Sequence, residues 1–400
     1  MTFKRLYLHV GFGKCGSSSI QAFLSNNPDF LCVNGDTLVY AALMQNQLIY
    51  GHELVKQAKL SPYHYKNSVS LATLKPAPKD YFASAVGDQL LTLLADKAVV
   101  LSQEDWHQEA DYWQEVDIFR QNSIDVTAIF YLRPPVTWIN SAWWQWGAWS
   151  GLDFEDWLLQ TIDNIVYVNS IRKFSKIDWI NKIEVRLLGK DLLTDFAHLL
   201  NIDLSNTQGL QTVINRSLPN GILRLYQTHP HLRPNPHASS IDFMLENFLQ
   251  LDGTTDWVLT PDHITRIIKK SRNSNLALLD FLDQPSQAQL LADARYWDSS
   301  AYVGMSTRPP SGIKPTYEEL EQIALAGVTA VKSLVAQQNR RNTEVNPENA
   351  DFWRDLALQV ESGNLRLAYE LMQEAYKRRP SGPLINKKLA EYEKMLKTIK

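Results

Sequence analysis

Cysteine is almost absent from this 400-residue sequence, which carries only Cys15 and Cys32. Two cysteines cannot build a disulfide framework, so the disulfide-rich secreted class is excluded. No apolar run reaches the roughly 18 residues of a membrane span, and the first apolar stretch, Leu6–Val10, is too short for a signal peptide. The formal net charge of −3 gives no bulk attraction to nucleic acid. These absences favour a globular, cytoplasmic protein with no nucleic-acid partner and no transmembrane segment.

The N-terminal stretch, in contrast, changes character twice within a few residues. Leu6–Val10 is a short apolar run typical of a buried parallel strand. Gly11–Ser19 is a turn rich in glycine and serine with a single cation, Lys14, and apolar residues fall at helical spacing from Ile20 onward. A strand, a loop and a helix N-terminus present free backbone N–H groups and a positive dipole end to an anion. The stretch therefore predicts a phosphate site.

The position of the lysine distinguishes between kinds of phosphate site. ATP- and GTP-binding loops follow the pattern G-x-x-x-x-G-K-[ST]. Gly11 and Gly16 have this spacing, but Ser17 stands where the lysine belongs. A small-molecule kinase is therefore the second choice, since no magnesium-holding aspartate is evident at a strand end either. A third alternative is a non-catalytic scaffold, in which the nucleotide fold is degenerate and a helical C-terminal tail binds a partner.

A second candidate anion contact lies further along the chain. Asp125–Leu132 is a β-branched, apolar run that leads to Arg133, and Pro134 ends the strand because proline cannot donate to a ladder. Ser141 follows eight residues after the arginine, on a segment predicted to be helical. A strand tip and the second turn of the next helix can converge on one anion. The pair therefore predicts a second contact with a phosphorylated ligand.

These two groups of residues resemble the nucleotide contacts of sulfotransferases that use 3′-phosphoadenosine 5′-phosphosulfate (PAPS). In that family a K-x-G-[ST]-[ST]-[ST] loop wraps the 5′-phosphosulfate, and a strand-end arginine with a helix serine holds the 3′-phosphate. The resemblance, mainly to bacterial polysaccharide and heparan-type members, implies an α/β fold with a P-loop-like parallel sheet flanked by helices. It covers roughly residues 1–300, with weaker matches at Asn215–Ser217 and Ser274–Asn275. The residues it assigns to PAPS binding are Gly13, Lys14, Cys15, Gly16, Ser17, Ser18, Ser19, Arg133 and Ser141.

The resemblance also implies sulfuryl transfer without a metal, in which an acceptor hydroxyl attacks sulfur in line. Lys14 would stabilise the oxygen that leaves with the nucleotide. The family carries its general base after the strand predicted here at Ala98–Ser102, as a glutamate or a histidine. Glu104 is therefore the first candidate and His107 the alternative. Capping of the next helix or pairing with a cation is the competing explanation for Glu104, and a thiol mechanism at Cys15 is a minor one.

Tryptophan is unusually frequent, with 12 in the chain. Core packing explains most tryptophans in most proteins, but aromatic faces beside a sulfuryl site also suit the C–H faces of a sugar ring. One or two of the clustered tryptophans are expected to meet an acceptor, which favours a hydroxyl of a carbohydrate or glycolipid. The cluster consists of Trp138, Trp143, Trp144, Trp146, Trp149 and Trp157.

Helix-like and strand-like segments alternate through the first half of the chain, which predicts right-handed crossovers and a parallel sheet. Further strands are predicted at Thr37–Tyr40 and Ile183–Leu188, and a helix over Phe154–Phe174. Residues 284–316 carry several prolines and are predicted to be a loop or linker.

The C-terminal region is predicted to be entirely helical. Gly363, Ala368, Ala375 and Pro380 fit the spacing of a tetratricopeptide helix hairpin. One such repeat cannot bury its own face, so a tail over residues 315–400 is expected to pack on the first domain or on a protein partner. The sequence thus predicts a sulfotransferase domain over residues 1–300 and a tetratricopeptide-like tail.

Overall fold

The computed structural model divides the chain into two compact units, Met1–Leu320 and Glu321–Lys400. The predicted Asn215–Ser217 contact lies outside the residues that the structure describes. Those residues are 4–61, 63–210, 218–239, 242, 245, 255–343, 349–361 and 363–398.

The first unit is built on a mixed seven-stranded sheet in which five neighbouring strands, from β3 to β7 in the order below, are parallel. The strand order is β2-β3-β5-β1-β6-β7, and β4 pairs with β3. Both β2 and β4 run antiparallel to β3. The strands are β1 Arg5–Val10, β2 Phe30–Leu31, β3 Thr37–Leu43, β4 Leu48–Tyr50, β5 Ala98–Gln103, β6 Asp125–Leu132 and β7 Lys182–Leu187.

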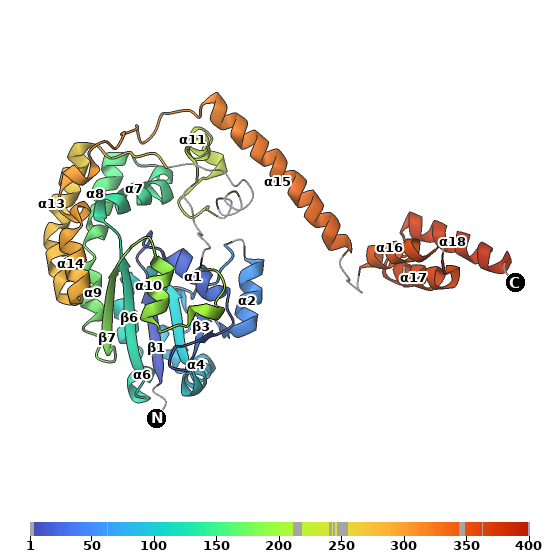
Figure 1. Cartoon of the computed structure of the whole chain (residues 1–400), viewed down its shortest axis with the longest axis horizontal. Helices are drawn as coiled ribbons and strands as arrows, with labels where there is room; N and C mark the ends of the chain where they lie inside the picture. The colour runs from blue at the N-terminus through green and yellow to red at the C-terminus, as the bar shows by residue number, and fades with distance from the viewer. Residues whose placement is uncertain are drawn as a thin grey trace. The chain divides into compact units, whose positions relative to one another are not determined.

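Strand β1 lies at the point where the strand order reverses. From β1 the chain crosses to β3 and β5 on one side, then passes back over β1 to β6 and β7 on the other. Because parallel crossovers are right-handed, this reversal puts helices on opposite faces, and Figure 1 shows helices on both sides of the sheet. Ligands of such sheets bind beyond the carboxyl ends of the strands at the reversal point. The ends of β1, β5 and β6 are therefore the expected position of a site.

The core explains why the central strands are almost continuously apolar. In β1 the side chains of Leu6, Leu8 and Val10 are fully buried, and in β6 those of Val126 and Ala128 are too. A strand covered by helices on both faces has no solvent side, so the alternation of polar and apolar residues disappears. The strands predicted from this feature near residues 6–10, 98–102, 125–132 and 183–188 are confirmed within a residue or two.

The helices of the first unit begin at recognisable caps. Ser84 caps α4 and Asp153 caps α8 with a side-chain oxygen, and Thr260 forms a capping box with His263 at the start of α13. The helices are α1 Ser17–Ser25, α2 Gly51–Leu60, α3 Pro78–Phe82, α4 Ala85–Asp96, α5 Ala110–Gln114, α6 Ile118–Gln121, α7 Pro135–Gln145, α8 Phe154–Thr161, α9 Val168–Phe174, α10 Leu192–Leu199, α11 Asn220–Thr228, α13 Pro261–Ala277 and α14 Gln284–Ala292.

Two sequence predictions about these helices were wrong. Residues 284–316 are not all loop, because α14 occupies Gln284–Ala292 with Asp283 as its cap and Pro285 in its first turn. Proline there marks a helix start, since its missing N–H has no intrahelical acceptor at that position anyway. The helix predicted over Phe154–Phe174 is broken into α8, a 3₁₀ turn and α9. No helix in the described ranges is long and apolar enough to cross a bilayer.

The second unit is helical. Its core combines three fully buried alanines, Ala357, Ala368 and Ala375, with the larger side chains of Met372, Ile385 and Tyr392. The alanines let α16 and α17 approach closely. Asp351 on α16 pairs with Arg379 just after α17, which joins the two helices at one end. The helices beyond the sheet domain are α15 Tyr317–Thr343, which crosses the boundary between the units, α16 Ala350–Val360, α17 Leu365–Arg378 and α18 Pro383–Thr398.

Candidate active site

The loop that joins β1 to α1 leaves the sheet at its reversal point. Lys14 (φ 61°) and Gly16 (φ 96°) both adopt left-handed backbone conformations there. This conformation is uncommon for residues other than glycine, so the one at Lys14 is unusual. Gly16 is the N-cap of α1, no side chain caps this end, and no acidic residue occupies its first turn. The first N–H groups of a helix have no intrahelical acceptor, so this end of α1 offers donors to an anion.

Ser17, the first residue of α1, provides independent evidence that a hydrogen-bond partner is missing at this helix end. Its side chain is 2% exposed, and its hydroxyl oxygen has no hydrogen-bond partner. Buried polar groups without a partner are uncommon because burial costs the hydrogen bonds they made with water. A methyl group at Gly11 would lie 2.3 Å from this oxygen, so the glycine is required for the close approach. The loop therefore holds a buried hydroxyl donor for which the protein itself supplies no acceptor.

Arg133 and Ser141 lie beside this loop, as their spacing predicts. Arg133 follows the last residue of β6, and Ser141 lies on α7. The guanidinium of Arg133 donates to the backbone oxygen of Lys14 at 3.3 Å and to Thr137 Oγ1 at 3.3 Å. These bonds tie the strand tip to both the glycine-rich loop and α7, which fixes the direction of the cation.

These groups line one cavity of about 680 Å³, named here the cationic cavity. Two further cations line it that the sequence analysis missed, Lys190 and Arg295. Lys190 follows the end of β7, so its position beyond a parallel strand was a usable signal. Arg295 comes from a distant 3₁₀ turn and pairs with Asp293 at 2.6 Å, and no pattern in the sequence indicates it. The hydroxyl-bearing residues in the lining are Ser17, Ser18, Ser19, Thr137, Ser141 and Thr194.

Glu104 follows β5, the neighbour of β1, and its carboxyl group lies against the glycine-rich loop. A methyl group at Gly13 would lie 3.0 Å from Glu104 Oε1 and 2.6 Å from Trp146 Cη2. The absence of a side chain at Gly13 thus lets the loop, the carboxyl and the indole meet. Burial raises the pKa of Glu104 to about 7, against the opposing attraction of the Lys14 charge. Near neutral pH this carboxyl can therefore both lose and gain a proton.

His107 lies one turn further on. Its Nδ1 is 3.0 Å from two backbone carbonyl oxygens, those of Gly11 and Glu104. Because carbonyls only accept, Nδ1 carries the proton and donates. In the neutral ring Nε2 is then an acceptor, and Gln108 Nε2 donates to it at 3.2 Å. Burial lowers the pKa of His107, so the ring is neutral at pH 7 and presents a lone pair.

A second cavity of about 630 Å³ contains Glu104 and His107, and we name it the amide cavity. Three of the six clustered tryptophans line it: Trp138, Trp146 and Trp157. Trp138 is held by donation from its Nε1 to the Gly13 oxygen at 2.6 Å. The other three tryptophans of the cluster are buried packing residues. The six carboxamides in the lining are Gln21, Asn67, Gln103, Gln108, Gln145 and Asn164.

The two cavities share three residues: Lys14, Ser18 and Glu104. The Lys14 ammonium donates to Gln145 Oε1 at 3.3 Å, so the lysine reaches toward the amide cavity while its backbone joins the loop of the cationic one. A cation and a carboxyl with a pKa near 7 therefore stand where a ligand in one cavity would face a ligand in the other. Such an arrangement can transfer a group between two bound molecules.

Two other predicted loop residues have different positions. Gly13 lines the amide cavity, whereas Cys15 lines neither cavity and is 1% exposed. Burial raises the pKa of Cys15 to about 12, so its thiol stays protonated and does not act as a thiolate nucleophile at neutral pH. Both cysteines are free and buried. In the described parts of the chain, no three His, Cys, Asp or Glu side chains gather as a metal site would require.

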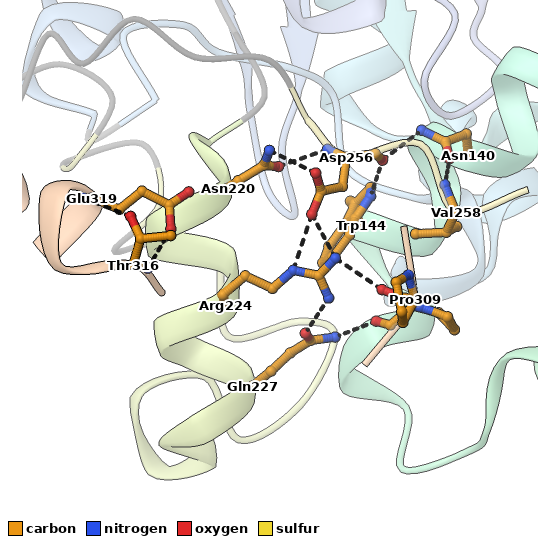
Figure 2. Close-up of polar contacts among 11 residues, drawn as sticks. Asn140, Trp144, Asn220, Arg224, Gln227, Asp256, Val258, Pro309, Thr316 and Glu319 are labelled. Carbon is orange, nitrogen blue, oxygen red and sulfur yellow. Dashed lines mark hydrogen bonds and ion pairs between the residues drawn. The ribbon is translucent and has the colours of Figure 1, made fainter. Parts of the chain in front are cut away.

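The segment from Asn220 to Asp256 reaches the amide cavity from outside the sheet, and its two ends are clamped together. Asn220 Nδ2 donates to Asp256 Oδ1 at 2.8 Å, and the Asp256 N–H donates back to Asn220 Oδ1 at 2.6 Å (Figure 2). Arg224, 1% exposed, adds an ion pair to Asp256 at 2.5 Å. From α7, Trp144 Nε1 donates to the backbone oxygen of Asp256 at 2.8 Å.

Residues between these ends contribute to the amide cavity. His237 and Ser239 line it. Arg233 forms a buried ion pair with Asp242 at 2.5 Å and donates to the Gln145 backbone oxygen at 2.8 Å. The segment is thus attached to α7 at two places. Asp256 accepts from Trp144, and Arg233 donates to Gln145, the last residue of the helix, beside the cavity. This clamp is invisible in the sequence because its members are far apart along the chain.

No protein-family model matches the chain, and no curated protein matches it. Among solved structures, the chain is similar to a sulfotransferase from Alicyclobacillus acidocaldarius, with 15% sequence identity and a TM-score of 0.32. The alignment covers 60% of this chain and 94% of that one.

Proposed function

We propose that the protein is a PAPS-dependent sulfotransferase that transfers a sulfuryl group to a hydroxyl of a carbohydrate or glycolipid. The observation that carries this proposal is the pair of cavities that share Lys14, Ser18 and Glu104. One cavity is rich in cations and hydroxyls and suits a phosphorylated donor. The other, lined by amides and aromatic rings, suits an uncharged acceptor.

In the cationic cavity, the loop and the N-terminus of α1 would bind the 5′-phosphosulfate. The orphaned hydroxyl of Ser17 supports this role because an anionic oxygen would supply the acceptor that it lacks. Arg133 and Ser141, on the other side of the cavity, would bind the 3′-phosphate. Charge-assisted hydrogen bonds to phosphate are about twice as strong as neutral ones. The bonds of Arg133 to Thr137 and to the Lys14 backbone would hold its guanidinium in position for such a contact.

The reaction is then an in-line displacement at sulfur. The acceptor oxygen forms a bond to sulfur, the bond from sulfur to the bridging oxygen of the nucleotide breaks, and the electron pair leaves on that oxygen. Lys14 would stabilise the charge on the leaving oxygen. Glu104 would take the proton of the acceptor hydroxyl, which its pKa of about 7 allows at neutral pH.

His107 is the alternative base. Its neutral ring with a lone pair on Nε2 can also accept a proton, and it lies in the amide cavity. Glu104 is preferred because it lines both cavities whereas His107 lines only one. A base at the junction is close to both the attacking and the leaving oxygen.

The two units would have separate tasks. Residues 1–300 would form the sulfotransferase domain, and the helices of residues 315–400 a tetratricopeptide-like tail that binds a protein partner. The tail proposal is supported by the buried small residues Ala368 and Ala375 at hairpin spacing.

Calorimetry with adenosine 3′,5′-bisphosphate and, separately, ATP with Mg²⁺ tests the proposed donor. Binding of the bisphosphate without metal is expected, together with much weaker binding of ATP. Preference for ATP–Mg²⁺ would instead indicate a kinase, and binding of neither would indicate a scaffold. Incubation with labelled PAPS and a panel of glycosides then tests transfer itself.

A further inference from the structure

The charges around the amide cavity differ from what an anionic acceptor would require. Lys14 is the one lysine or arginine among its described lining residues, and it also faces the donor cavity. Two carboxyl groups, those of Glu104 and Asp105, are part of the same lining. An acceptor with carboxylates or sulfates would bring negative charge to these groups and to a donor that is itself anionic. Burial of charges without paired cations is costly.

The polar groups that replace cations here are carboxamides, and several are already fixed. Gln21 Nε2 donates to Ser102 Oγ at 3.1 Å, and Ser102 bonds to His9 Nδ1 at 2.8 Å. Gln103 Nε2 donates to the Ser68 oxygen at 2.7 Å, and Asn67 Nδ2 donates to Gln103 Oε1 at 3.3 Å. Because these amides are held before any ligand binds, less side-chain entropy is lost on binding.

An amide side chain offers two N–H donors and a carbonyl acceptor with two lone pairs. Gln21 forms one of these bonds within the protein and so keeps a second N–H and its carbonyl for a ligand, whereas Gln103, whose oxygen also accepts from the Glu104 N–H, keeps one N–H. Hydroxyl groups both donate and accept, and they match amides without bringing charge. The aromatic rings supply the apolar surface that the C–H faces of a sugar ring can cover. Tyr63 and Tyr65, with ring centroids 5.9 Å apart, and Trp146, 6.1 Å from Trp138, are the candidates for such contacts.

We infer that the amide cavity selects an uncharged, polyhydroxylated acceptor and rejects the acidic form of the same sugar. This inference rests on the proposed function, since it names the substrate class of the acceptor cavity. It differs from an acceptor of the acidic polysaccharide type because the described lining offers amides where such a substrate would require arginine and lysine. Specificity then comes partly from repulsion of the wrong ligand.

Direct binding tests the inference without depending on transfer. Full-length protein saturated with adenosine 3′,5′-bisphosphate is titrated with an alkyl glucoside, the matching alkyl glucuronide and a phenol of similar size. Tryptophan fluorescence reports binding because three indoles line the cavity. The glucoside is expected to bind at least tenfold more tightly than the glucuronide and more tightly than the phenol. Tightest binding of the glucuronide or the phenol, or no binding of the glucoside at millimolar concentration, overturns the inference.

A charge-adding variant sharpens the test. Asn164 is exposed at the amide cavity, and Asn164→Lys should reduce the preference for the glucoside at least threefold. Asn169→Lys adds the same charge at an exposed position outside both cavities and should leave the preference unchanged. An unchanged preference in Asn164→Lys counts against charge as the selecting property.

The proposed function can fail independently of this inference. It fails if the protein does not bind the bisphosphate in calorimetry. The three titrations are then repeated without the bisphosphate, and the order of affinities still decides the inference about the cavity. If the bisphosphate binds and the glucuronide binds as tightly as the glucoside, the donor assignment stands and the acceptor class is wrong.

Discussion

The two cavities meet at one lysine and one carboxyl, yet their linings differ in kind. The cationic cavity has four lysine and arginine side chains, Lys14, Arg133, Lys190 and Arg295, together with several hydroxyls. The amide cavity has six carboxamides and, among the residues described, no lysine or arginine except Lys14. The first suits a ligand with several negative charges, the second a ligand with none. Under the proposed function, charge or its absence would therefore distinguish the donor from the acceptor.

The two linings also differ in where the chain supplies them. Most of the cationic cavity comes from the ends of β1, β6 and β7 and from the first turns of the helices that follow. The amide cavity draws on the segments around residues 63–67, 103–108, 145–164 and 237–239. Strand ends thus supply most of the cationic cavity, whereas loops and helix ends supply most of the amide cavity.

Glu104→Gln should have the largest effect and acts where the cavities meet. The amide keeps the shape but cannot take a proton near neutral pH. Turnover is expected to fall by roughly 10²–10⁴, while affinity for adenosine 3′,5′-bisphosphate stays within about twofold. Steady-state kinetics and calorimetry measure the two quantities. A variant that keeps more than a tenth of its turnover removes Glu104 as the base, and His107→Asn becomes the next variant to measure.

Gly13→Ala should disturb the junction from the loop side. The new methyl group would lie 2.6 Å from Trp146 Cη2 and 3.0 Å from Glu104 Oε1, so both groups must shift. Turnover is expected to fall roughly ten- to a hundredfold, because small misplacements of reacting groups are costly. The control is Gly327→Ala on α15, outside both cavities, where a methyl group meets nothing within 4 Å. Equal activity in the two variants would show that the Gly13 contact does not matter.

Arg133→Ala should affect the cationic cavity alone. Loss of a charge-assisted bond costs about 1.5–3 kcal/mol, so affinity for adenosine 3′,5′-bisphosphate should fall about tenfold or more. Affinity for adenosine 5′-phosphosulfate, which lacks the 3′-phosphate, should barely change, and so should glucoside binding. Arg172→Ala removes an exposed arginine outside both cavities as the control. A similar loss for both nucleotides contradicts the assigned contact.

Ser17→Ala should change binding and stability in opposite directions. The variant lacks the donor to the ligand, so nucleotide affinity should fall by about threefold to tenfold, as expected for one hydrogen bond. It also lacks a buried hydroxyl that has no partner in the free protein, so the free energy of unfolding without ligand should stay equal or rise by up to about 1 kcal/mol. Denaturant unfolding with and without bisphosphate measures both. A clear loss of stability without ligand would show that the hydroxyl is satisfied in the free protein.

The pH dependence should separate the two candidate bases by a small but measurable shift. Burial raises the pKa of Glu104 to about 7 and lowers that of His107 from its usual 6.5. A base must be deprotonated, so kcat/KM should fall as the pH drops below about 7 if Glu104 acts. If His107 acts, the fall should begin only below 6.5. The position of this acidic limb in the wild type, and its loss in Glu104→Gln, decide between them.

The sequence was informative wherever a contact is local. Lys14, Ser17 and Gly16 belong to one strand–turn–helix unit, and Arg133 with Ser141 to another. Spacing predicted the contacts within each unit, and the resemblance to PAPS sulfotransferases predicted that the two units would share one site. Lys190, at the end of β7, was within reach of the same reasoning. Arg295 was not, because its position depends on how a distant 3₁₀ turn packs near the end of β6.

The amide cavity could not have been predicted from spacing. Gln21 lies on α1, Asn67 on a connecting segment, Gln145 at the end of α7 and Asn164 on a 3₁₀ turn. Amide residues are common on surfaces, and nothing in their neighbours marks these four. Only the packing of the elements brings them together, which is also why the Asp256 clamp was missed. The high density of tryptophans in this part of the sequence indicated that some of them would line a site. It did not indicate which three of the six would do so.

The clamp also has a consequence for how the chain around the amide cavity can change. Asn220 and Asp256 are 36 positions apart in the sequence, yet they bond to each other, so the chain leaves and returns at almost one point. For a flexible loop between fixed ends, doubling its length costs only about 0.6 kcal/mol in closure entropy. Insertions between the two residues are therefore expected to cost little stability, provided that Arg224 and Arg233 keep their ion pairs. Under the proposed function, an insertion there would change the lining near His237 and Ser239 and leave the ends of the central strands in place.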